Sequence, residues 1–203
     1  MKILDLCSGT GSATQAFRDR GHVVHTLDIE GNHDFICDVL QFSPLWGYYD
    51  FIWASPPCTC FSMAAVGHHW NNHIPKPETL EAIKIVNKVI NICKRSRYFM
   101  IENPMAMLRT IIPEQRRKYY LSTVTYCQYG DTAMKPTDLL HNIDSFHPLR
   151  CKNGDKCHVA SPRHSHNPGS TQGKKLLNER YKVPYGLSLA VCKAIERDMC
   201  VLA

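Results

Sequence analysis

The chain has 203 residues, of which 44% are hydrophobic and 21% are charged, and it carries a formal net charge of +6 at pH 7. This composition indicates one folded globular domain, alone or with a small appendage. No apolar run approaches the roughly 20 residues that cross a bilayer, and the N-terminus shows no signal peptide, so we expect a cytoplasmic protein with no membrane partner. The ten cysteines fall mostly within strand-like and helix-like segments, and we expect most of them to be reduced.

The positive charge is concentrated in one part of the chain. Residues 141–185 contain eight lysines and arginines and three acids, which is a balance of +5 out of the total of +6. A solvated loop can carry such charge without a function, but a basic surface beside a cleft also attracts polyanions. The stretch from Arg150 to Lys182 is therefore a candidate contact for nucleic-acid phosphates.

The first elements have the pattern of a nucleotide-type cofactor site. Residues 2–6 predict a strand, Cys7-Ser8-Gly9-Thr10-Gly11-Ser12 a glycine turn, and residues 13–20 a helix. Glycines let the backbone approach a ligand closely, and a helix N-terminus offers free N–H groups. A second strand, residues 23–28, ends in Asp28, where a carboxylate can accept hydrogen bonds from ribose hydroxyls.

Residues 50–54 predict a buried strand that stops at Pro56-Pro57 and is followed by Cys58. Prolines cannot donate to a sheet ladder, so they end the strand and fix the direction of the chain. A thiol on such a turn is a candidate nucleophile, because strand ends open onto ligand crevices in α/β sheets. The alternative is a buried cysteine that acts as a small hydrophobic residue.

The remaining segments alternate between strand and helix patterns. A short strand or turn is predicted at residues 35–39, an irregular loop at 63–77, and an amphipathic helix at 78–95 with Leu80, Ile83, Val86, Ile90 and Cys93 on its core face. A strand is predicted at 97–101 and stops at Glu102-Asn103-Pro104. Two more strands are predicted at 121–126 and 138–141, an aperiodic region at 142–175, and a helix at 185–201. This alternation predicts an α/β fold with a seven-stranded, mostly parallel sheet and helices on both faces. The glycine turn, the thiol and the acids then meet at one sheet edge.

These motifs resemble those of the S-adenosylmethionine-dependent DNA cytosine-5 methyltransferases. The resemblance rests on Asp5-Leu6-Cys7-Ser8-Gly9-Thr10-Gly11, on Ser55-Pro56-Pro57-Cys58 with Phe61-Ser62, and on Glu102-Asn103-Pro104, in that order and spacing. It implies a Rossmann-like class I methyltransferase fold with a catalytic, cofactor-binding domain at residues 1–141, a short basic target-recognition region at 142–182, and a C-terminal helix at 183–203 that packs back on the catalytic domain. The small size suggests a phage or mobile-element origin.

The resemblance also implies roles for individual residues. Cys58 is expected to add to carbon 6 of cytosine, Glu102 to hydrogen-bond to N3, and Asn103 to orient the loop that carries Cys58. The residues expected to bind S-adenosyl-L-methionine are Asp5, Leu6, Cys7, Ser8, Gly9 and Gly11 in the first motif, Asp28 and Ile29 at the ribose, Asp38 and Val39 at the adenine, and Pro56 on the floor of the site. Cys60 is expected to be a bystander.

Two departures from the family pattern concern the substrate. The Gln-x-Arg-x-Arg motif is missing, and Gln128-Tyr129-Gly130 followed by Lys135-Pro136-Thr137 stands in its place, so Lys135 is a candidate for part of the missing positive charge. The target-recognition region is short. Double-stranded DNA is the leading expectation for the substrate, which an enzyme would reach by flipping the base out of the stack. RNA or a free cytosine nucleotide, and a catalytically silent DNA- or cofactor-binding relative, stay open.

The basic region also contains candidate metal ligands. Cys151, Cys157, His158, His164 and His166 offer soft and imidazole donors in a segment with no core of its own, which is a common setting for structural zinc. The five residues between the cysteines exceed the two to four typical of zinc pairs. Zinc and a set of free thiols with solvated histidines therefore stay open as alternatives.

Overall fold

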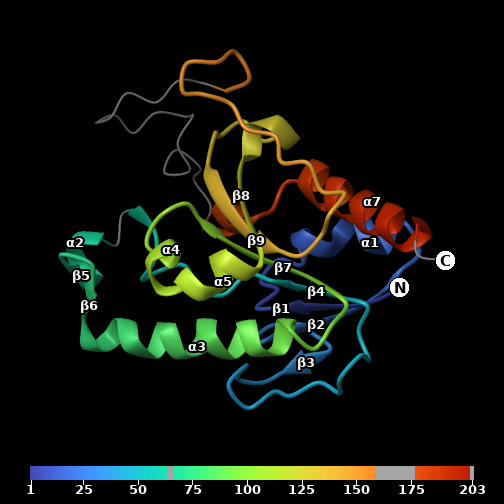
Figure 1. Cartoon of the computed structure of the whole chain (residues 1–203), viewed down its shortest axis with the longest axis horizontal. Helices are drawn as coiled ribbons and strands as arrows, with labels where there is room; N and C mark the ends of the chain where they lie inside the picture. The colour runs from blue at the N-terminus through green and yellow to red at the C-terminus, as the bar shows by residue number, and fades with distance from the viewer. Residues whose placement is uncertain (64–65, 159–176, 202–203) are drawn as a thin grey trace.

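The computed structural model describes residues 1–63, 66–158 and 177–201, and its centre is a seven-stranded sheet (Figure 1). The strands are β1 (Lys2–Leu6), β2 (Val23–Asp28), β3 (Phe35–Ile36), β4 (Phe51–Ala54), β7 (Tyr98–Pro104), β8 (Tyr120–Thr125) and β9 (Pro136–His141), in the spatial order β3-β2-β1-β4-β7-β9-β8. Strand β9 is antiparallel to both of its neighbours, β7 and β8, and the other neighbouring pairs are parallel. The predicted α/β class and mostly parallel sheet are confirmed.

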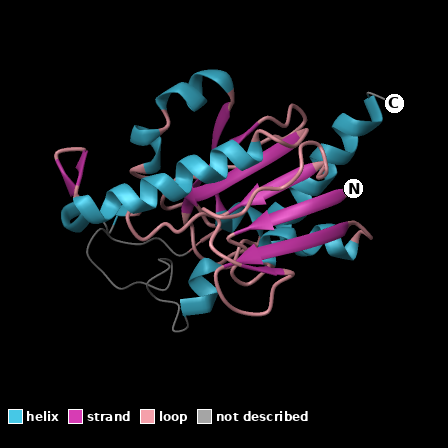
Figure 2. Cartoon of the chain, turned by 90° about the horizontal axis from the view of Figure 1, so that it is seen from below, coloured by secondary structure: helices cyan, strands magenta, loops and turns pink. Residues whose placement is uncertain are grey.

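Helices cover both faces of the sheet (Figures 1 and 2). One face carries α3 (Pro77–Cys93), α4 (Leu108–Ile111) and α5 (Pro113–Lys118); the other carries the 3-10 turn η1 (Ser12–Thr14), α1 (Gln15–Asp19) and α7 (Tyr185–Val201). Strand β4 shows why both faces are covered, because Ile52 and Ala54 enter the α3-side core while Phe51 and Trp53 enter the α7-side core. A central parallel strand is normally buried on both faces in this way.

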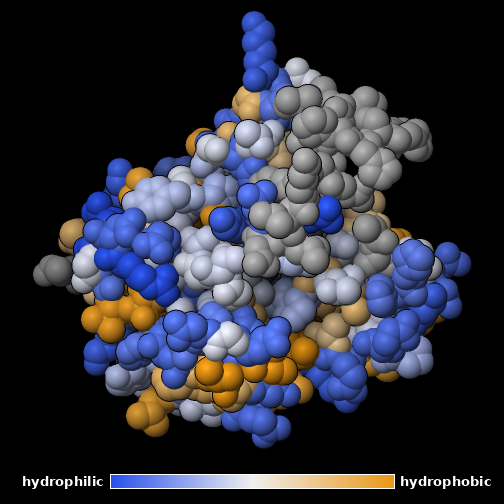
Figure 3. All heavy atoms as spheres, turned by 180° about the vertical axis from the view of Figure 1, so that it is seen from behind, coloured by the Kyte–Doolittle hydropathy of each residue, from blue (hydrophilic) through white to orange (hydrophobic). Residues whose placement is uncertain are grey.

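The two long helices were predicted correctly from their patterns. Helix α7 has the predicted bounds, and α3 differs from its predicted bounds by one residue at the start and two at the end. Of the side chains expected on the core face of α3, Val86, Ile90 and Cys93 are buried, whereas Leu80 is 48% exposed. No helix in the described ranges combines the length and the apolar character that a bilayer crossing needs. On the face seen in Figure 3, hydrophobic side chains lie in groups among hydrophilic ones.

The irregular loop predicted for residues 63–77 is wrong in part. The structure places α2 (Val66–His69) there, followed by a hairpin of β5 (Trp70–Asn71) and β6 (Ile74–Pro75). Asn72 and His73 have positive φ angles of 45° and 69°, which is the backbone that a two-residue hairpin turn requires. Strands of two residues are too short to show an alternating pattern, so periodicity could not reveal them.

Three further differences concern the length of β7 and short helices that the sequence did not predict. This strand continues through Glu102 and Asn103 to Pro104, because β9 pairs with it over that length. The proline is tolerated at the last position of the strand. Helices α4 and α5 were not predicted, and α5 begins with Pro113 at its first position, where a missing N–H costs nothing. Helix α6 (Leu177–Tyr181) was also missed.

Gly186, at the start of α7, is predicted to be intolerant of a side chain. A Cβ atom there would lie 2.5 Å from the Tyr129 carbonyl oxygen, which belongs to the 3-10 turn η3 (Tyr126–Tyr129). We expect Gly186→Ala to lower the free energy of unfolding by about 1–3 kcal/mol, because backbone must move. Gly67→Ala is the control, since a Cβ in α2 meets open space. Urea denaturation of both variants tests this, and equal stability would contradict the packing described.

Candidate active site

A cleft of about 1630 Å³ opens at the carboxyl ends of β1, β2, β4 and β7. These four strands are parallel, so the turns that follow them share one edge of the sheet. The predicted site residues that line the cleft are Cys7, Ser8, Gly9, Gly11, Asp28, Ile29, Asp38, Val39, Pro56, Cys58 and Glu102. The volume exceeds the roughly 300–1,000 Å³ of most small-molecule sites, so the cleft has room for two ligands.

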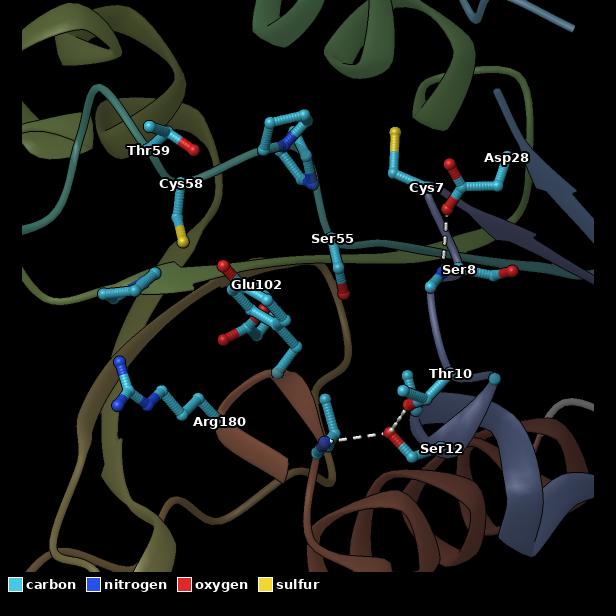
Figure 4. Close-up of a pocket in the computed structure, with 18 of the residues that line it drawn as sticks. Cys7, Ser8, Thr10, Ser12, Asp28, Ser55, Cys58, Thr59, Glu102 and Arg180 are labelled. Carbon is cyan, nitrogen blue, oxygen red and sulfur yellow. Dashed lines mark hydrogen bonds between the residues drawn. The ribbon is translucent and has the colours of Figure 1, made fainter. Parts of the chain in front are cut away.

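The glycine turn after β1 forms one end of the cleft. Cys7, Gly9 and Gly11 have φ angles of 54°, 50° and 68°, so the backbone turns sharply here. Asp28 fixes this turn, because its carboxylate accepts a hydrogen bond from the Gly9 N–H at 2.8 Å (Figure 4). It also accepts one from the Ile29 N–H at 2.7 Å. Each carboxylate oxygen can accept a second bond, so Asp28 can also bind a donor in the cleft.

Asp5 and Leu6 lie beneath the turn rather than in the cleft. Both are fully buried, and the Asp5 carboxylate accepts a 2.6 Å hydrogen bond from the Thr14 hydroxyl. Burial raises the pKa of Asp5 to about 7, because the ionised carboxylate has lost its water. Its other oxygen has no hydrogen-bond partner among the described residues. Asp5 therefore joins β1 to η1 and supports the turn from below.

Asp38 provides a second carboxylate on the same side of the cleft. It lies after β3, and its Oδ1 accepts a 2.9 Å hydrogen bond from the Leu40 N–H, which holds the side chain in place. Asp28 and Asp38 therefore offer two fixed sets of acceptors along one wall. A ligand with hydroxyl and amino donors at two separate positions would satisfy both.

Cys58 lies at the other end of the cleft, on a loop that is held from two sides. Asn103, which is fully buried, donates a 3.1 Å hydrogen bond from its amide to the Pro56 carbonyl. The Cys58 carbonyl accepts hydrogen bonds from the N–H groups of Phe61 and Ser62, and Phe61 is itself fully buried. The Cys58 thiol points toward Glu102 (Figure 4).

Glu102 is held by a partner that the sequence did not reveal. The hydroxyl of Tyr126 donates a 2.9 Å hydrogen bond to Glu102 Oε1, and both side chains are almost completely buried. Burial and the nearby Glu102 charge raise the pKa of Tyr126 well above its usual range, so the tyrosine stays a donor. With Oε1 occupied in this way, Oε2 is the oxygen available to a ligand.

The charges around Cys58 control its ionisation. Burial raises the pKa of this thiol, the Glu102 charge raises it further, and Lys135 opposes both. The Lys135 ammonium lies 4.5 Å from the centre of the Tyr126 ring and donates a hydrogen bond to the Arg180 carbonyl. Arg180 lines the same part of the cleft, which gives it a second cationic side chain (Figure 4).

The other thiols near the cleft are placed differently. Cys7 lies by the glycine turn, where burial first and the charge of Asp28 second raise its pKa to about 12. Cys60 does not line the cleft, and its sulfur lies 3.8 Å from His69 Nδ1. Cys58 differs from Cys7 in that both Glu102 and Lys135 affect its pKa.

The basic region is described only in part. Arg150, Lys152, Lys156, Arg180 and Lys182 lie within the described residues, and all but the half-buried Arg180 are exposed. Arg163, Lys174 and Lys175 lie outside the described residues. The predicted phosphate contact therefore remains a prediction.

Comparison with known proteins adds one relative and two solved structures, and no family model matches the chain. The chain is 29% identical over 199 residues to a frog virus 3 protein called "Probable DNA (cytosine-5)-methyltransferase", covering 87% of this chain and 85% of the relative. An Entamoeba histolytica methyltransferase superposes with a TM-score of 0.51 at 12% identity, and a putative DNA modification methyltransferase encoded within an E. coli prophage with 0.50 at 13%. Each superposition covers 75% of this chain but only 57% and 52% of those structures. The fold is thus the one seen in methyltransferases.

Proposed function

Because this chain is related in sequence and fold to the DNA cytosine-5 methyltransferases, we propose that it methylates carbon 5 of cytosine through a covalent bond to Cys58. The observation that carries this proposal is the position of the Cys58 thiol beside the Glu102 carboxyl, in the same cleft as the glycine turn. Cys58 lies on the loop after β4 and Glu102 lies in β7, 44 residues later in the sequence. A cysteine that only packs in the core would not require a carboxyl group beside its thiol.

Carbon 5 of cytosine is a weak nucleophile, and the Cys58 thiolate would activate it by adding to carbon 6. The addition pushes electrons toward N3 of the ring, where a proton donor stabilises them. Glu102 in its acid form can serve as this donor, because Oε1 accepts from Tyr126 while Oε2 carries the proton toward N3. After methylation, loss of the C5 proton and elimination of Cys58 release the product.

The electrostatics link these two roles. The Cys58 pKa is raised by burial and by the Glu102 charge, so the thiol keeps its proton while Glu102 is ionised. When Glu102 is protonated and bonded to the base, this repulsion disappears, so only burial still raises the Cys58 pKa and Lys135 opposes it. A bound cytosine that keeps Glu102 in its acid form would therefore make the thiolate easier to form.

S-adenosyl-L-methionine would supply the methyl group as a sulfonium, and the first half of the cleft fits this cofactor. Its ribose hydroxyls and adenine amine are donors at two separate positions, which matches the two fixed carboxylates of Asp28 and Asp38. The left-handed turn at Gly9 and Gly11 lets the backbone approach the methionine end closely. Pro56, two residues before Cys58, also lines the cleft.

Asp28→Ala tests the cofactor assignment. We expect the affinity for S-adenosyl-L-methionine, measured by calorimetric titration, to fall about 10- to 100-fold, because hydrogen bonds to a charged group contribute about 1.5–3 kcal/mol. Asp50→Ala is the matched control: Asp50 also accepts from a backbone N–H, that of Lys2 at 2.7 Å, but at the opposite edge of the sheet. Unchanged affinity in a folded Asp28→Ala variant would contradict the ribose assignment.

We propose double-stranded DNA as the substrate, with the target base flipped into the cleft. The exposed side chains of Arg150, Lys152, Lys156 and Lys182 support contact with phosphates, which should weaken as salt rises. Transfer of labelled methyl groups to duplex DNA, single-stranded DNA, RNA and dCMP, followed by nucleoside analysis, tests this directly. Preference for RNA or dCMP would change the substrate, and transfer to none of the four would favour a silent binding protein.

A further inference from the structure

Three cysteines and one histidine form a compact cluster outside the proposed catalytic groups. Cys127 lies in η3, directly after β8, while Cys151, Cys157 and His158 belong to the loop that follows β9. The Cys127 sulfur lies 3.3 Å from that of Cys151 and 3.6 Å from that of Cys157. His158 Nδ1 lies 3.7, 3.6 and 3.3 Å from the sulfurs of Cys127, Cys151 and Cys157.

These distances are those of ligands around a small tetrahedral ion. With Zn–S bonds of about 2.3 Å and Zn–N bonds of about 2.0–2.1 Å, a tetrahedral site separates its sulfurs by about 3.8 Å and sulfur from nitrogen by about 3.6 Å. A disulfide needs a sulfur separation of about 2.05 Å and would use only two of the four groups. We propose that Cys127, Cys151, Cys157 and His158 bind one zinc ion.

The chemistry of the ligands favours zinc in a structural role. Three thiolates and an imidazole are soft and borderline donors, and four protein ligands leave no open position for a substrate. Binding would release the three thiol protons to solvent, so the loaded site would carry a charge of −1. The exposed Lys152 and Lys156 lie on the same loop and offset this charge.

The sequence pointed to only part of this set. It singled out Cys151, Cys157 and His158, together with His164 and His166, which lie outside the described residues. It gave no sign of Cys127, which is 24 residues before Cys151 and ends a strand-like segment. Cys151 and Cys157 are farther apart in sequence than a typical zinc pair because they do not form a pair by themselves. Cys127, from η3, lies beside both of them.

The loop holding three of the ligands depends on this connection. Cys151 is tied to β8 by hydrogen bonds with Thr125, whose hydroxyl accepts from the Cys151 N–H at 2.9 Å. Thr125, Tyr126 and Cys127 are consecutive, so zinc would fasten the loop next to the tyrosine that holds Glu102. His158 also lines the cleft, which places the zinc loop at its rim.

A second group of potential ligands, His22, Cys192 and Glu196, does not have this character. Both oxygens of Glu196 already accept hydrogen bonds from Arg20, at 3.0 and 2.7 Å, and Oε1 also faces His22 Nε2 at 3.0 Å. This carboxylate is engaged in an ion pair. Only the Cys127 cluster among the described residues therefore carries the proposal.

Metal analysis of the untagged, full-length protein tests the site without any variant. The protein is purified under reducing conditions without chelator, and inductively coupled plasma mass spectrometry is expected to find about one zinc per chain. Replacing zinc by Co²⁺ is expected to give the intense visible bands of tetrahedral cobalt and a thiolate charge-transfer band in the near ultraviolet. Absence of bound metal, or octahedral Co²⁺ spectra, would overturn the proposal.

Cys157→Ser identifies the ligands, because Cys157 is exposed and its replacement leaves the core intact. Loss of a residue that hydrogen-bonds to a metal ligand lowers metal affinity about 10- to 100-fold. Loss of a direct ligand such as Cys157 should lower zinc affinity by more than that. Cys200→Ser, the same change at an exposed cysteine on α7, should keep the zinc. Equal zinc content in both variants, or a Cys127–Cys151 disulfide in protein alkylated at lysis, would contradict the site.

Discussion

Cys58→Ser is expected to reduce methyl transfer by about 10⁴-fold or more, the largest effect that the structure predicts for a single side chain. A serine hydroxyl ionises far less readily than a thiol, and the charged groups that act on Cys58, Glu102 and Lys135, include no imidazole that could take its proton. Lys135 and Arg180 are cations, and Glu102 must donate rather than accept in the same step. Initial rates with the preferred substrate at saturating cofactor measure the loss.

Cys60→Ser is the matched control for this prediction. It makes the same atomic change two residues away, but Cys60 lies outside the cleft and faces His69. We expect its rate to stay within about twofold of the parent, because the Cys60 thiol does not line the cleft and the change is isosteric. Calorimetry should show unchanged cofactor affinity in both variants. A rate loss in Cys60→Ser that equals the loss in Cys58→Ser would mean that the loop, and not the Cys58 thiol, was damaged.

Glu102→Gln is expected to slow methyl transfer by about 10²- to 10⁴-fold, the usual contribution of a positioned acid. An amide can still hydrogen-bond to N3, but it cannot transfer a proton to it. Tyr126→Phe should cost about tenfold, because it removes only the hydrogen bond that holds Oε1. Cofactor affinity should not change in either variant.

Glu102→Gln should also make Cys58 easier to alkylate. This result would distinguish the loss of the Glu102 acid from a general disturbance of the active site. The Glu102 charge raises the Cys58 pKa, so replacing the carboxylate by a neutral amide removes that contribution and the pKa falls. The pH profile of Cys58 alkylation, followed by peptide mass spectrometry, should therefore shift to lower pH while turnover drops. A shift to higher pH, or no shift, would contradict the electrostatic link between the two groups.

The sequence was sufficient for the fold because the sheet signals are local. The apolar runs at residues 2–6, 23–28 and 50–54 each end at a turn of recognisable chemistry, and a parallel sheet brings those turns to one edge. The hairpin after α2 was missed because its strands are two residues long, and because its turn has positive φ angles at Asn72 and His73 with no glycine to mark it.

The parts of the site that escaped prediction depend on long-range contacts. Tyr126 meets Glu102 from the turn η3 that follows β8, the strand on the far side of β9, and no pattern near Tyr126 marks it as a partner. Arg180 and Lys135 enter the cleft from segments 45 residues apart. Cys127 joins the zinc cluster in the same way. The sequence indicates which types of side chain are available, but only the tertiary structure shows which of them are neighbours.

Trapping with 5-fluorocytosine is the most direct test of the central claim that Cys58 forms a covalent bond to the base. Fluorine at carbon 5 cannot leave as a cation, so elimination of the thiol should stop after methyl transfer and leave the protein attached to its substrate. We predict an adduct that forms only when S-adenosyl-L-methionine is present, and that maps to Cys58 after digestion and mass spectrometry. Methylation without any adduct, or an adduct on Cys60 or Cys7, would contradict the mechanism.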